Sequence, residues 1–349
     1  VNSVSRETMN LKKKYDVVVV GGGHAGIEAA LAPARLGLRV ALITLDASSI
    51  GRMSCNPAIG GLAKGHLVRE VDALGGQMGC LADAAGIQFK MLNKSKGKAV
   101  WSPRAQIDKK HYESLVSFAV QSEPNLDIVE GEARKVLTKK GVVSGVTIDD
   151  QTNISCRSLV LTCGTFLNGL VHVGGRKISA GRMGEEASDG ITESLVSLGF
   201  TSGRLKTGTP PRLQSGSIDW DKTEEVFGDK NPRPFSFRTT NFDPPNLPCH
   251  MTYTNTITHE IILGSLSKSP LYCNEIAGVG PRYCPSIEDK VVRFEDRASH
   301  HLFLEPEWVG SDQIYTNGFS TSLPEDVQLK ALRTVPGLSN VSFYRPGYA

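Results

Sequence analysis

The sequence contains a cysteine in a setting that could make its thiol a nucleophile. Cys55 lies in the glycine-rich segment Ser54–Gly61, close to Lys64 and His66 along the chain. Nearby positive charge and a helix N-terminus both stabilise a thiolate, and they thereby lower the pKa of a cysteine. The alternative is that Cys55 is a small residue packed beside a cofactor, and the local sequence leaves both interpretations open.

A second cysteine lies in a loop that prolines make stiff. Pro281 and Pro285 flank residues 282–284, the last of which is Cys284, with arginine and lysine nearby. Because each proline fixes a backbone dihedral angle, such a loop would hold a thiolate nucleophile in place. A structural loop with a free thiol fits the same residues, so both roles stay open for Cys284.

A third group of residues has the spacing of a diphosphate-binding turn. Gly21, Gly23 and Gly26 form a G-x-G-x-x-G pattern that directly follows the apolar run Tyr15–Val20 and opens an alanine-rich helix over 25–36. The first glycine permits a tight turn, the second lets the backbone approach a phosphate, and the third allows close helix–strand packing. The helix N-terminus adds free N–H groups and a partial positive charge. In this context the pattern predicts a bound dinucleotide.

Two further features bear on which dinucleotide binds. An acidic residue about twenty positions beyond the turn usually takes the ribose hydroxyls. Asp46 has that spacing and follows a predicted strand over 38–44. A later strand ends in Thr162-Cys163-Gly164, which resembles the short second signature of flavoproteins with two dinucleotide folds. This second feature favours FAD over the cofactor of a simple NAD dehydrogenase.

Basic residues gather around a proline-containing turn. Arg204, Lys206 and Arg212 surround Thr-Pro-Pro at 209–211. The turn could bind phosphates of a cofactor or of RNA, and a solvated basic turn explains it nearly as well. Arg104 is a further cationic candidate, without independent support.

The composition excludes several classes of protein. Seven cysteines, an odd number, form no C-x-x-C pair and no zinc-ligand spacing, so we expect a reduced, cytoplasmic protein without a metal site. No apolar run approaches the roughly 20 residues needed to cross a bilayer, so no membrane association is expected. A net charge of +3 allows an anionic partner without requiring one.

The predicted elements place these residues in an α/β fold. Strand, glycine turn, helix and strand make one βαβ unit, and three predicted strands over 126–148 read as an antiparallel meander on the parallel sheet. Prolines and aromatic residues accumulate after about residue 204, as in an inserted domain. We therefore predict a Rossmann-like, two-dinucleotide-fold FAD-binding flavoprotein with an inserted α+β domain. Its expected parts are a disordered or tag-derived tail at 1–14, the FAD-binding domain at 15–203, an insertion on the NADH and substrate side at 204–282, and a return to the FAD-binding domain at 283–349.

Several blocks of the sequence resemble the MnmG (GidA) family. They are Gly-Gly-Gly-His-Ala-Gly at 21–26, Met-Ser-Cys-Asn-Pro-Ala-Ile-Gly-Gly at 53–61, Val-Asp-Ala-Leu-Gly-Gly at 71–76, Gly-Arg-Leu-Lys-Thr-Gly-Thr-Pro-Pro-Arg at 203–212, Gly-Pro-Arg-Tyr-Cys-Pro-Ser-Ile-Glu-Asp-Lys at 280–290, Phe-Leu-Glu-Pro-Glu at 303–307 and Asn-Gly-Phe-Ser-Thr-Ser-Leu-Pro at 317–324. The resemblance covers nearly everything from 15 to 349. Blocks of this length are too specific to match by chance.

The resemblance implies an activity with its cofactors and partners. The family installs a carboxymethylaminomethyl or aminomethyl group on carbon 5 of the wobble uridine of certain tRNAs. It works with the GTPase MnmE, as a homodimer within a heterotetramer, and it uses FAD, NADH and 5,10-methylenetetrahydrofolate. Matched residue by residue, the FAD contacts would come from Gly21, Gly22, Gly23, His24, Ala25, Gly26, Ala133, Gly164 and Ser188. The segment that the family associates with the dinucleotide corresponds to Gly280, Pro281, Arg282, Tyr283, Cys284, Pro285, Ser286, Ile287, Glu288, Asp289, Lys290, Val291, Val292, Arg293 and Phe294.

The resemblance also assigns a role to the two cysteines. Cys55 and Cys284 match the pair on which the family's activity is thought to depend. Carbon 5 of uracil is a poor nucleophile until a thiolate adds at carbon 6 and gives carbon 5 enolate character. The wobble base lies in a loop, so it can be splayed into a pocket at modest cost. We expect Cys284 to be the attacking residue.

The sequence departs from the family pattern at a few positions and in length. Lys98 stands where proline is usual, Arg52 where glutamine is usual, and Trp308 where glycine is common. Family members continue beyond residue 349 into more of the flavin domain and a helical C-terminal domain. That domain is expected to contact MnmE and much of the tRNA, and we expect residues 1–349 not to include it.

Three other functions compete with this interpretation. A folate- and FAD-dependent tRNA uracil-5 methyltransferase shares the glycine and cysteine motifs, but the insertion at 204–282 and the 280–290 block favour the MnmG family. A disulfide reductase would need paired redox cysteines after the first helix, which are missing. A non-catalytic tRNA-binding scaffold that keeps FAD for structure is the alternative from outside the enzymes.

Overall fold

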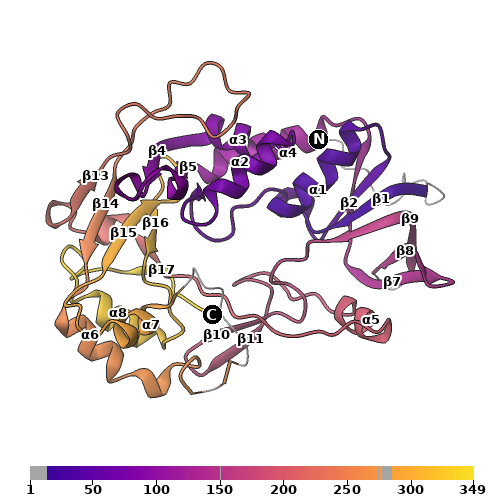
Figure 1. Ribbon diagram of the computed structural model, residues 1–349. Coiled ribbons are helices and arrows are strands. Elements are labelled where there is room, and N and C mark those ends of the chain that lie inside the picture. The colour runs from indigo at the N-terminus through magenta and orange to yellow at the C-terminus, as the bar shows by residue number, and fades with distance from the viewer. Residues whose placement is uncertain (1–13, 150, 274, 277–284) are drawn as a thin grey trace.

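The first core of the protein forms around a parallel sheet (Figure 1). The computed structural model describes residues 14–149, 151–273, 275–276 and 285–349. Its first sheet contains four parallel strands in the order β6-β2-β1-β9, namely β6 (Leu126–Glu130), β2 (Val40–Thr44), β1 (Lys14–Val20) and β9 (Thr152–Leu161). The predicted βαβ unit is confirmed, with the glycine turn between β1 and the helix α1 (His24–Arg35).

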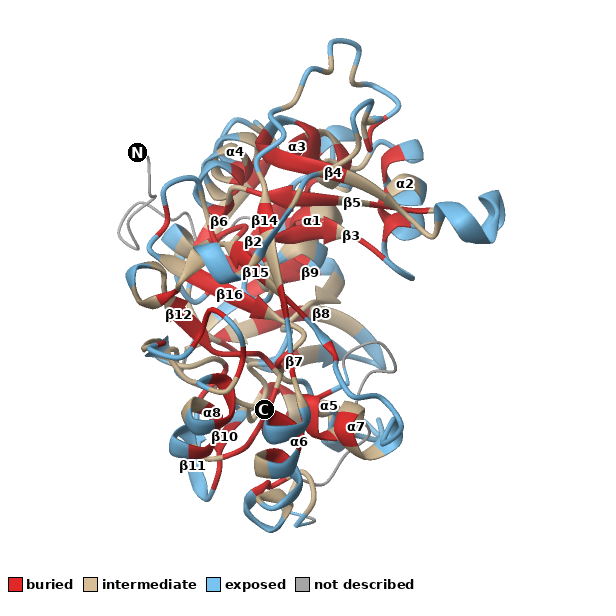
Figure 2. Ribbon diagram, turned by 90° about the vertical axis from the view of Figure 1, so that its left-hand side faces the viewer, coloured by how far each residue is buried: buried red, intermediate tan, exposed pale blue. Residues whose placement is uncertain are grey.

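Both faces of this sheet are covered, which is why its central strands are apolar at nearly every position. Alternate residues of β1 point to opposite faces: Val17 and Val19 pack with α1 and α4 (Lys109–Gln121), whereas Val18 and Val20 pack under the antiparallel strands. The burial colours in Figure 2 follow this arrangement, since β2 and much of α1 are buried. The result is a layer of helices, a parallel sheet and a β-meander.

The predicted meander is correct in kind but wrong in one strand. The strands β7 (Ala133–Lys139) and β8 (Val142–Ile148) pair antiparallel with each other, and β8 pairs antiparallel with β9. The segment 126–130, predicted as part of the meander, is instead β6, which pairs parallel with β2. The difference arises after β6, because the N–H of Gly131 donates to the Thr44 carbonyl (3.0 Å) and the chain does not form a hairpin there.

A second sheet has six strands, all antiparallel to their neighbours, in the order β13-β14-β15-β16-β12-β17. The strands are β12 (Arg212–Gln214), β13 (Glu224–Val226), β14 (Cys249–Tyr253), β15 (His301–Pro306), β16 (Gln313–Asn317) and β17 (Phe343–Arg345). Its apolar face packs with α6 (Thr256–Leu263), α7 (Ile287–Arg293) and α8 (Glu325–Leu332) in a core separate from that of the first sheet.

This sheet contains strands from both sides of the predicted domain boundary at residue 283. Strand β14, from the expected insertion, is hydrogen-bonded to β15, which was expected to return to the FAD-binding domain. Residues 285–345 therefore complete the second sheet and its core instead of rejoining the first. The change in composition near 204 marks proline-rich loops, whereas the sheet depends on pairing between strands about 50 residues apart, which composition does not encode.

Smaller elements complete the described chain. A three-stranded antiparallel sheet of β3 (Ala58–Gly60), β5 (Ser102–Ile107) and β4 (Gly86–Leu92) packs with α2 (Gly65–Ala73) and α3 (Met78–Ala85). A hairpin of β10 (Leu170–Val173) and β11 (Arg176–Ser179) and the helix α5 (Ile191–Ser197) follow the first sheet. Apart from Lys14, the predicted tail lies outside the described residues. No helix in the described ranges combines the length and apolarity needed to cross a bilayer.

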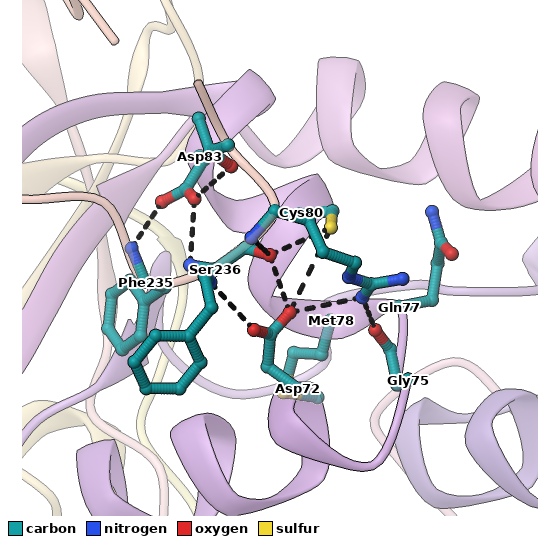
Figure 3. Close-up of polar contacts among 12 residues, drawn as sticks. Asp72, Gly75, Gln77, Met78, Cys80, Asp83, Phe235 and Ser236 are labelled. Carbon is teal, nitrogen blue, oxygen red and sulfur yellow. Dashed lines mark hydrogen bonds and ion pairs between the residues drawn. The ribbon is translucent and has the colours of Figure 1, made fainter. Parts of the chain in front are cut away.

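The long loop between β13 and β14 is fixed by two carboxylates from α2 and α3 (Figure 3). Asp83 accepts the backbone N–H groups of Phe235 (2.7 Å) and Ser236 (2.9 Å). Asp72 accepts the Ser236 hydroxyl (2.6 Å) and the N–H of Phe237 (2.8 Å). Burial raises the pKa of Asp83. Burial also acts to raise the pKa of Asp72, but its hydrogen bonds and Arg238 stabilise the anion and bring this pKa below its usual value. A loop with little regular structure is thereby held in one place.

The loop anchor predicts unequal effects for two nearby phenylalanines. Phe235 is 1% exposed in the first core, so Phe235→Ala should lower the free energy of unfolding by about 3–5 kcal/mol. Phe237 is 68% exposed, and the Arg69 guanidinium lies over its ring (5.4 Å), so Phe237→Ala should cost less than about 1 kcal/mol. Urea denaturation of both variants measures this difference, and equal losses would contradict the proposed anchoring.

Candidate functional site

The glycine turn has the geometry of an anion site at a helix N-terminus. A Cβ on Gly26 would lie 1.8 Å from the Gly21 carbonyl oxygen, and one on Gly21, whose φ is +108°, would lie 2.4 Å from the Thr162 carbonyl oxygen. Gly23 caps α1 without a side-chain hydrogen bond and has open space beside it. Among the described residues, the N–H groups of 22–26 donate to no protein acceptor. The turn therefore presents free donors where only glycine fits.

His24, inside the turn, adds a polar atom without a partner. Its Nδ1 is buried and has no hydrogen-bond partner among the described residues. Burial lowers the pKa of His24, so the ring is neutral at pH 7, and its edge packs on Tyr112 with 5.7 Å between ring centroids. Buried polar atoms normally have a hydrogen-bond partner, so this ring nitrogen and the free N–H groups beside it indicate that a polar ligand binds here.

Other predicted cofactor residues lie at the same carboxyl edge of the parallel sheet. Asp46 is exposed just beyond β2 and accepts the N–H of Ser48 (2.8 Å), which lowers the pKa of its carboxyl and keeps it ionised. The Thr162 hydroxyl donates to the Val20 (2.8 Å) and Gly21 (3.1 Å) carbonyls, which places the end of β9 beside the glycine turn. The exposed Gly164 comes two residues later in the chain. Ligands of open α/β sheets bind at this edge.

Ala133 and Ser188 are joined to each other through Glu132. The Ser188 hydroxyl donates to the Glu132 carboxylate (2.9 Å), as does the backbone N–H of Asp189 (3.0 Å). Ala133 is 4% exposed and packs against the first sheet under the meander. A role for either residue toward a cofactor would thus depend on backbone groups or on the hydroxyl of Ser188.

Cys55 lies exposed in the loop between β2 and β3, and residues from distant elements hold its backbone. Its carbonyl accepts Arg212 Nη2 (2.9 Å) and Lys109 Nζ (3.3 Å). Its Sγ lies 3.8 Å from the Tyr315 hydroxyl. The cations that contact the Cys55 backbone are therefore Lys109 and Arg212, from α4 and β12, and Arg182 donates to the hydroxyl of the preceding Ser54. The neighbours in sequence, Lys64 and His66, are both exposed and make no described hydrogen bond to Cys55.

Glu307 holds these two cations together. Its Oε1 accepts Lys109 Nζ and Arg212 Nε, each at 2.9 Å, and all three side chains are at most 7% exposed. Burial lowers the pKa of Lys109, and Glu307 opposes this shift. Burial alone would raise the pKa of Glu307, but the two cations keep it below its usual value. One anion between two cations leaves an excess positive charge in this buried cluster, and hydrogen bonds stabilise it: both cations donate to the Cys55 carbonyl, and Arg212 also donates to the Pro210 carbonyl (2.8 Å).

Tyr315 completes the surroundings of the thiol. Its ring lies 4.6 Å from the Arg212 guanidinium carbon, and it is 4% exposed. Burial, with a contribution from Cys55, raises the pKa of Tyr315 well above its usual value. The hydroxyl therefore keeps its proton and can donate to a thiolate at Cys55. The sulfur of Cys55 is exposed and lies beside the Tyr315 hydroxyl, while the two cations hold its backbone, so this cysteine is positioned to act as a nucleophile.

The basic residues of the turn predicted at 203–212 lie in different surroundings. Arg212 is 1% exposed and belongs to the Cys55 surroundings, whereas Arg204 is exposed and donates to the Asn168 carbonyl (3.0 Å). Arg104 pairs with Glu305 (2.7 Å). Lys109, Glu307 and Tyr315 were not singled out by sequence reasoning. The only signal for Glu307 was its place in the Phe-Leu-Glu-Pro-Glu block.

The 280–294 segment is only partly described. Residues 280–284, including Cys284, lie outside the described residues. Ser286 caps α7, and Ile287 and Val291 are at most 2% exposed in the second core. Glu288 is fully buried and accepts the Ser322 N–H (3.2 Å), and burial raises the pKa of its carboxyl. The side chains of Ile287 and Val291 therefore serve packing, and direct cofactor contact from this helix would need its other residues.

With this geometry established, comparison with known proteins defines the family. The sequence profile of the family described as "Glucose inhibited division protein A" matches residues 16–349. The chain belongs to this family, GidA. It is 52% identical over 341 residues to the tRNA uridine 5-carboxymethylaminomethyl modification enzyme MnmG of Thermodesulfovibrio yellowstonii, covering 98% of this chain and 55% of that protein. It is 53% identical over 335 residues to the protein of the same name from Campylobacter fetus, covering 96% of this chain and 54% of that protein.

Solved GidA structures share the fold described above. The chain superposes on Aquifex aeolicus GidA in its form I crystal with a TM-score of 0.91 and 49% identity, covering 96% of this chain and 57% of that one. In the form II crystal the TM-score is 0.89. The family assignment and the Rossmann-like α/β fold predicted from the sequence are thus confirmed. The chain spans about half the length of the curated GidA relatives it matches.

The buried ion cluster predicts a large cost for removing its carboxylate. Glu307→Gln leaves two buried cations without a matching charge, so it should lower the free energy of unfolding by about 3–5 kcal/mol. Glu325→Gln is the matched control, because Glu325 pairs with Arg176 in solvent (side chains 49% and 63% exposed) and should cost below about 1 kcal/mol. Chemical denaturation of both variants makes the comparison, and a Glu307→Gln cost as small as the control's would refute the cluster's role.

The same carboxylate predicts a pH dependence of stability. The pKa of Glu307 is lower in the folded protein than its usual 4.5, so its contribution is fully present above that value. That contribution is lost as the pH falls from 4.5 through the lower folded value, because protonation breaks both ion pairs. Wild type should therefore lose more stability than Glu307→Gln over this acidic range. Parallel pH dependences of the two proteins would contradict the assignment.

Proposed function

We propose that this protein is a FAD-dependent tRNA-modifying enzyme that acts on carbon 5 of a wobble uridine. The printed names of its relatives support the reaction class. The observation that carries the proposal is the joining of two sites: the Gly51 N–H donates to the Gly22 carbonyl (3.0 Å), four residues before Cys55. A chain of four residues spans at most about 14 Å, so the thiol lies near the diphosphate-binding turn.

The residues of the turn fit the pyrophosphate of FAD. Gly21 and Gly26 leave no room for a side chain, Gly23 faces open space, and the free N–H groups at the start of α1 can bind phosphate oxygens. Asp46, ionised at the adjacent strand end, would accept the ribose hydroxyls. Bound FAD would supply the redox chemistry, in exchange with NADH, while the protein positions and shields it.

The chain's own residues would prepare the cysteines. Arg212 and Lys109 fix the Cys55 carbonyl, and the Tyr315 hydroxyl lies beside its sulfur, so the sulfur of Cys55 would be held in one orientation. In the proposed covalent step a thiolate forms a bond to carbon 6 of uracil, and the electron pair of the 5,6 double bond moves to the enolate of the carbonyl at carbon 4. Carbon 5 of the enolate then forms a bond to an electrophilic C=N one-carbon unit, whose π electron pair moves to nitrogen. Loss of the proton from carbon 5 and expulsion of the thiolate from carbon 6 afterwards restore the double bond. We assign the attack to Cys284 and a supporting role to Cys55.

Further cofactors and partners belong to the proposal for the whole protein. They are NADH, 5,10-methylenetetrahydrofolate as the one-carbon source, tRNA, the GTPase MnmE, a homodimeric state and a cytoplasmic location. Support for them comes from the resemblance to the MnmG family, and for tRNA also from the relatives' names. Because the chain spans about 55% of those relatives, activity is proposed for the protein together with the rest of the family's length.

The turn predicts loss of FAD in a single-methyl variant. Gly26→Ala places a Cβ against the Gly21 carbonyl, so the turn must open and bound flavin should fall at least tenfold. Gly216→Ala is the matched control, because a Cβ there meets nothing within 4 Å. After gel filtration, the absorbance of the protein at about 450 nm measures how much flavin it has retained. A folded Gly26→Ala protein with full flavin would refute the assignment of the pyrophosphate site.

The cysteine assignment predicts different defects for two variants. With tRNA that carries 5-fluorouridine at the wobble position, Cys284→Ser should form no covalent adduct, because the attacking sulfur is gone. Cys55→Ser should lose modified nucleoside while its flavin is still reduced by NADH in stopped-flow mixing. An adduct with Cys284→Ser would move the attack to another residue, and a wild-type flavin that NADH never bleaches would favour a non-catalytic scaffold.

A further inference from the structure

A cavity is lined by residues other than those predicted to hold the cofactor. It measures about 440 Å³ and is bounded by β4, β5, α2 and the segment 229–233 of the long loop. Its walls include five cationic side chains, Arg69, Lys90, Lys94, Arg104 and Arg233, and one carboxylate, Asp229. A cavity with this charge is suited to an anion.

The cations of this cavity are only partly neutralised. Asp229 pairs with Lys94 (2.8 Å), and Arg104 pairs with Glu305 behind the wall (2.7 Å). Lys90 and Arg233 have no carboxylate within salt-bridge distance among the described residues. Lys90, on β4, and Arg233, on the loop, thus line one cavity without a fixed counter-charge, and such cations bind phosphate groups by charge-assisted hydrogen bonds.

An aromatic wall accompanies the charge. Trp101 lines the cavity, and its indole N–H donates to the Lys94 carbonyl (3.2 Å), which fixes the orientation of the ring. Phe89, also in the lining, is 4% exposed and packs edge-on against Phe242. An indole ring in the lining, together with cations that lack a counter-charge, has the chemistry of a nucleotide site, because a base can stack on such a ring.

The walls are held in place by hydrogen bonds within the protein. Asp229 accepts the Met91 N–H (2.9 Å), and its own N–H donates to the Phe89 carbonyl (2.7 Å). Arg69 donates to the Pro234 carbonyl (2.8 Å), directly before the segment that Asp72 and Asp83 anchor (Figure 3). The cavity is thus preorganised, which lowers the cost of binding.

Positive charge continues outward from the cavity. Beyond β4 the chain forms a projecting, exposed turn that carries Lys94, Lys96 and Lys98 (Figure 2). A row of exposed lysines next to a nucleotide-sized cavity matches a nucleic-acid strand better than a single small nucleotide, because a strand carries further phosphates at regular intervals.

We propose that this cavity binds one nucleotide of an RNA strand, with a phosphate between Lys90 and Arg233 and a base on Trp101, while the lysine turn contacts the neighbouring phosphates. The inference rests on the proposed function, since it names where the RNA substrate is held. It adds a binding site outside the glycine turn and the Cys55 surroundings. A free dinucleotide such as NADH shares the phosphate and base chemistry, so the test separates the two sources.

The test is anisotropy titration of a fluorescent anticodon stem-loop RNA with the protein, at salt concentrations between about 50 and 200 mM. Lys90→Gln and Arg233→Gln should each weaken binding and reduce the slope of log K against log salt by about 0.7, as for one lost phosphate contact of a single strand. Trp101→Ala should weaken binding about tenfold, and Trp101→Phe should keep most of the affinity. Lys139→Gln and Lys140→Gln, on the distant β7–β8 turn, are the matched controls and should leave the slope unchanged.

Each outcome has a distinct meaning. If wild type binds the RNA and the cavity variants, shown to be folded by circular dichroism, bind it as the controls do, the proposed site is wrong and the proposed function stands. If the cavity variants lose NADH binding in a parallel titration but keep RNA affinity, the cavity belongs to a free dinucleotide and the proposal is overturned. If wild type binds no RNA, both the proposed function and the RNA site in this cavity are contradicted.

Discussion

One buried carboxylate supports the arrangement of the candidate active site. Glu307 is the shared counter-ion of Lys109 and Arg212, and both cations also hold the Cys55 carbonyl. Lys109 begins α4, which packs on the parallel sheet, and Arg212 begins β12 of the second sheet. Because removing one partner leaves buried charge uncompensated, the two cores and the cysteine loop are fixed relative to each other at this point.

The same region gains a second connection through Asp108. One of its carboxylate oxygens caps α4 by accepting the His111 N–H (2.9 Å), and the other accepts the Val309 N–H (2.9 Å) from the chain after β15. The loop that carries Cys55 is joined to the glycine turn by the hydrogen bond from the Gly51 N–H to the Gly22 carbonyl. A cofactor site on the first sheet and a thiol supported by the second are therefore neighbours because of a few buried polar contacts.

Local patterns in the sequence predicted the local parts of this structure. The glycine turn, the strand before it and the helix after it were found because their residues are adjacent in the chain and obey steric rules for glycine and parallel strands. The parallel pairing of β6, the second sheet across residue 283, and the partners Lys109, Glu307 and Tyr315 were missed, since each depends on segments 50 to 260 residues apart. The assignments of Ala133, Ser188 and Cys284 remain predictions from the resemblance.

The most direct test of the account is a crystal structure of the protein with FAD bound. The account predicts pyrophosphate oxygens within about 2.7–3.2 Å of the N–H groups between Gly22 and Gly26. It also predicts that the Cys55 sulfur faces the flavin ring, with its carbonyl still held by Arg212 and Lys109. A pyrophosphate bound elsewhere, or a Cys55 loop released from the Glu307 cluster and turned away from the flavin, would contradict it.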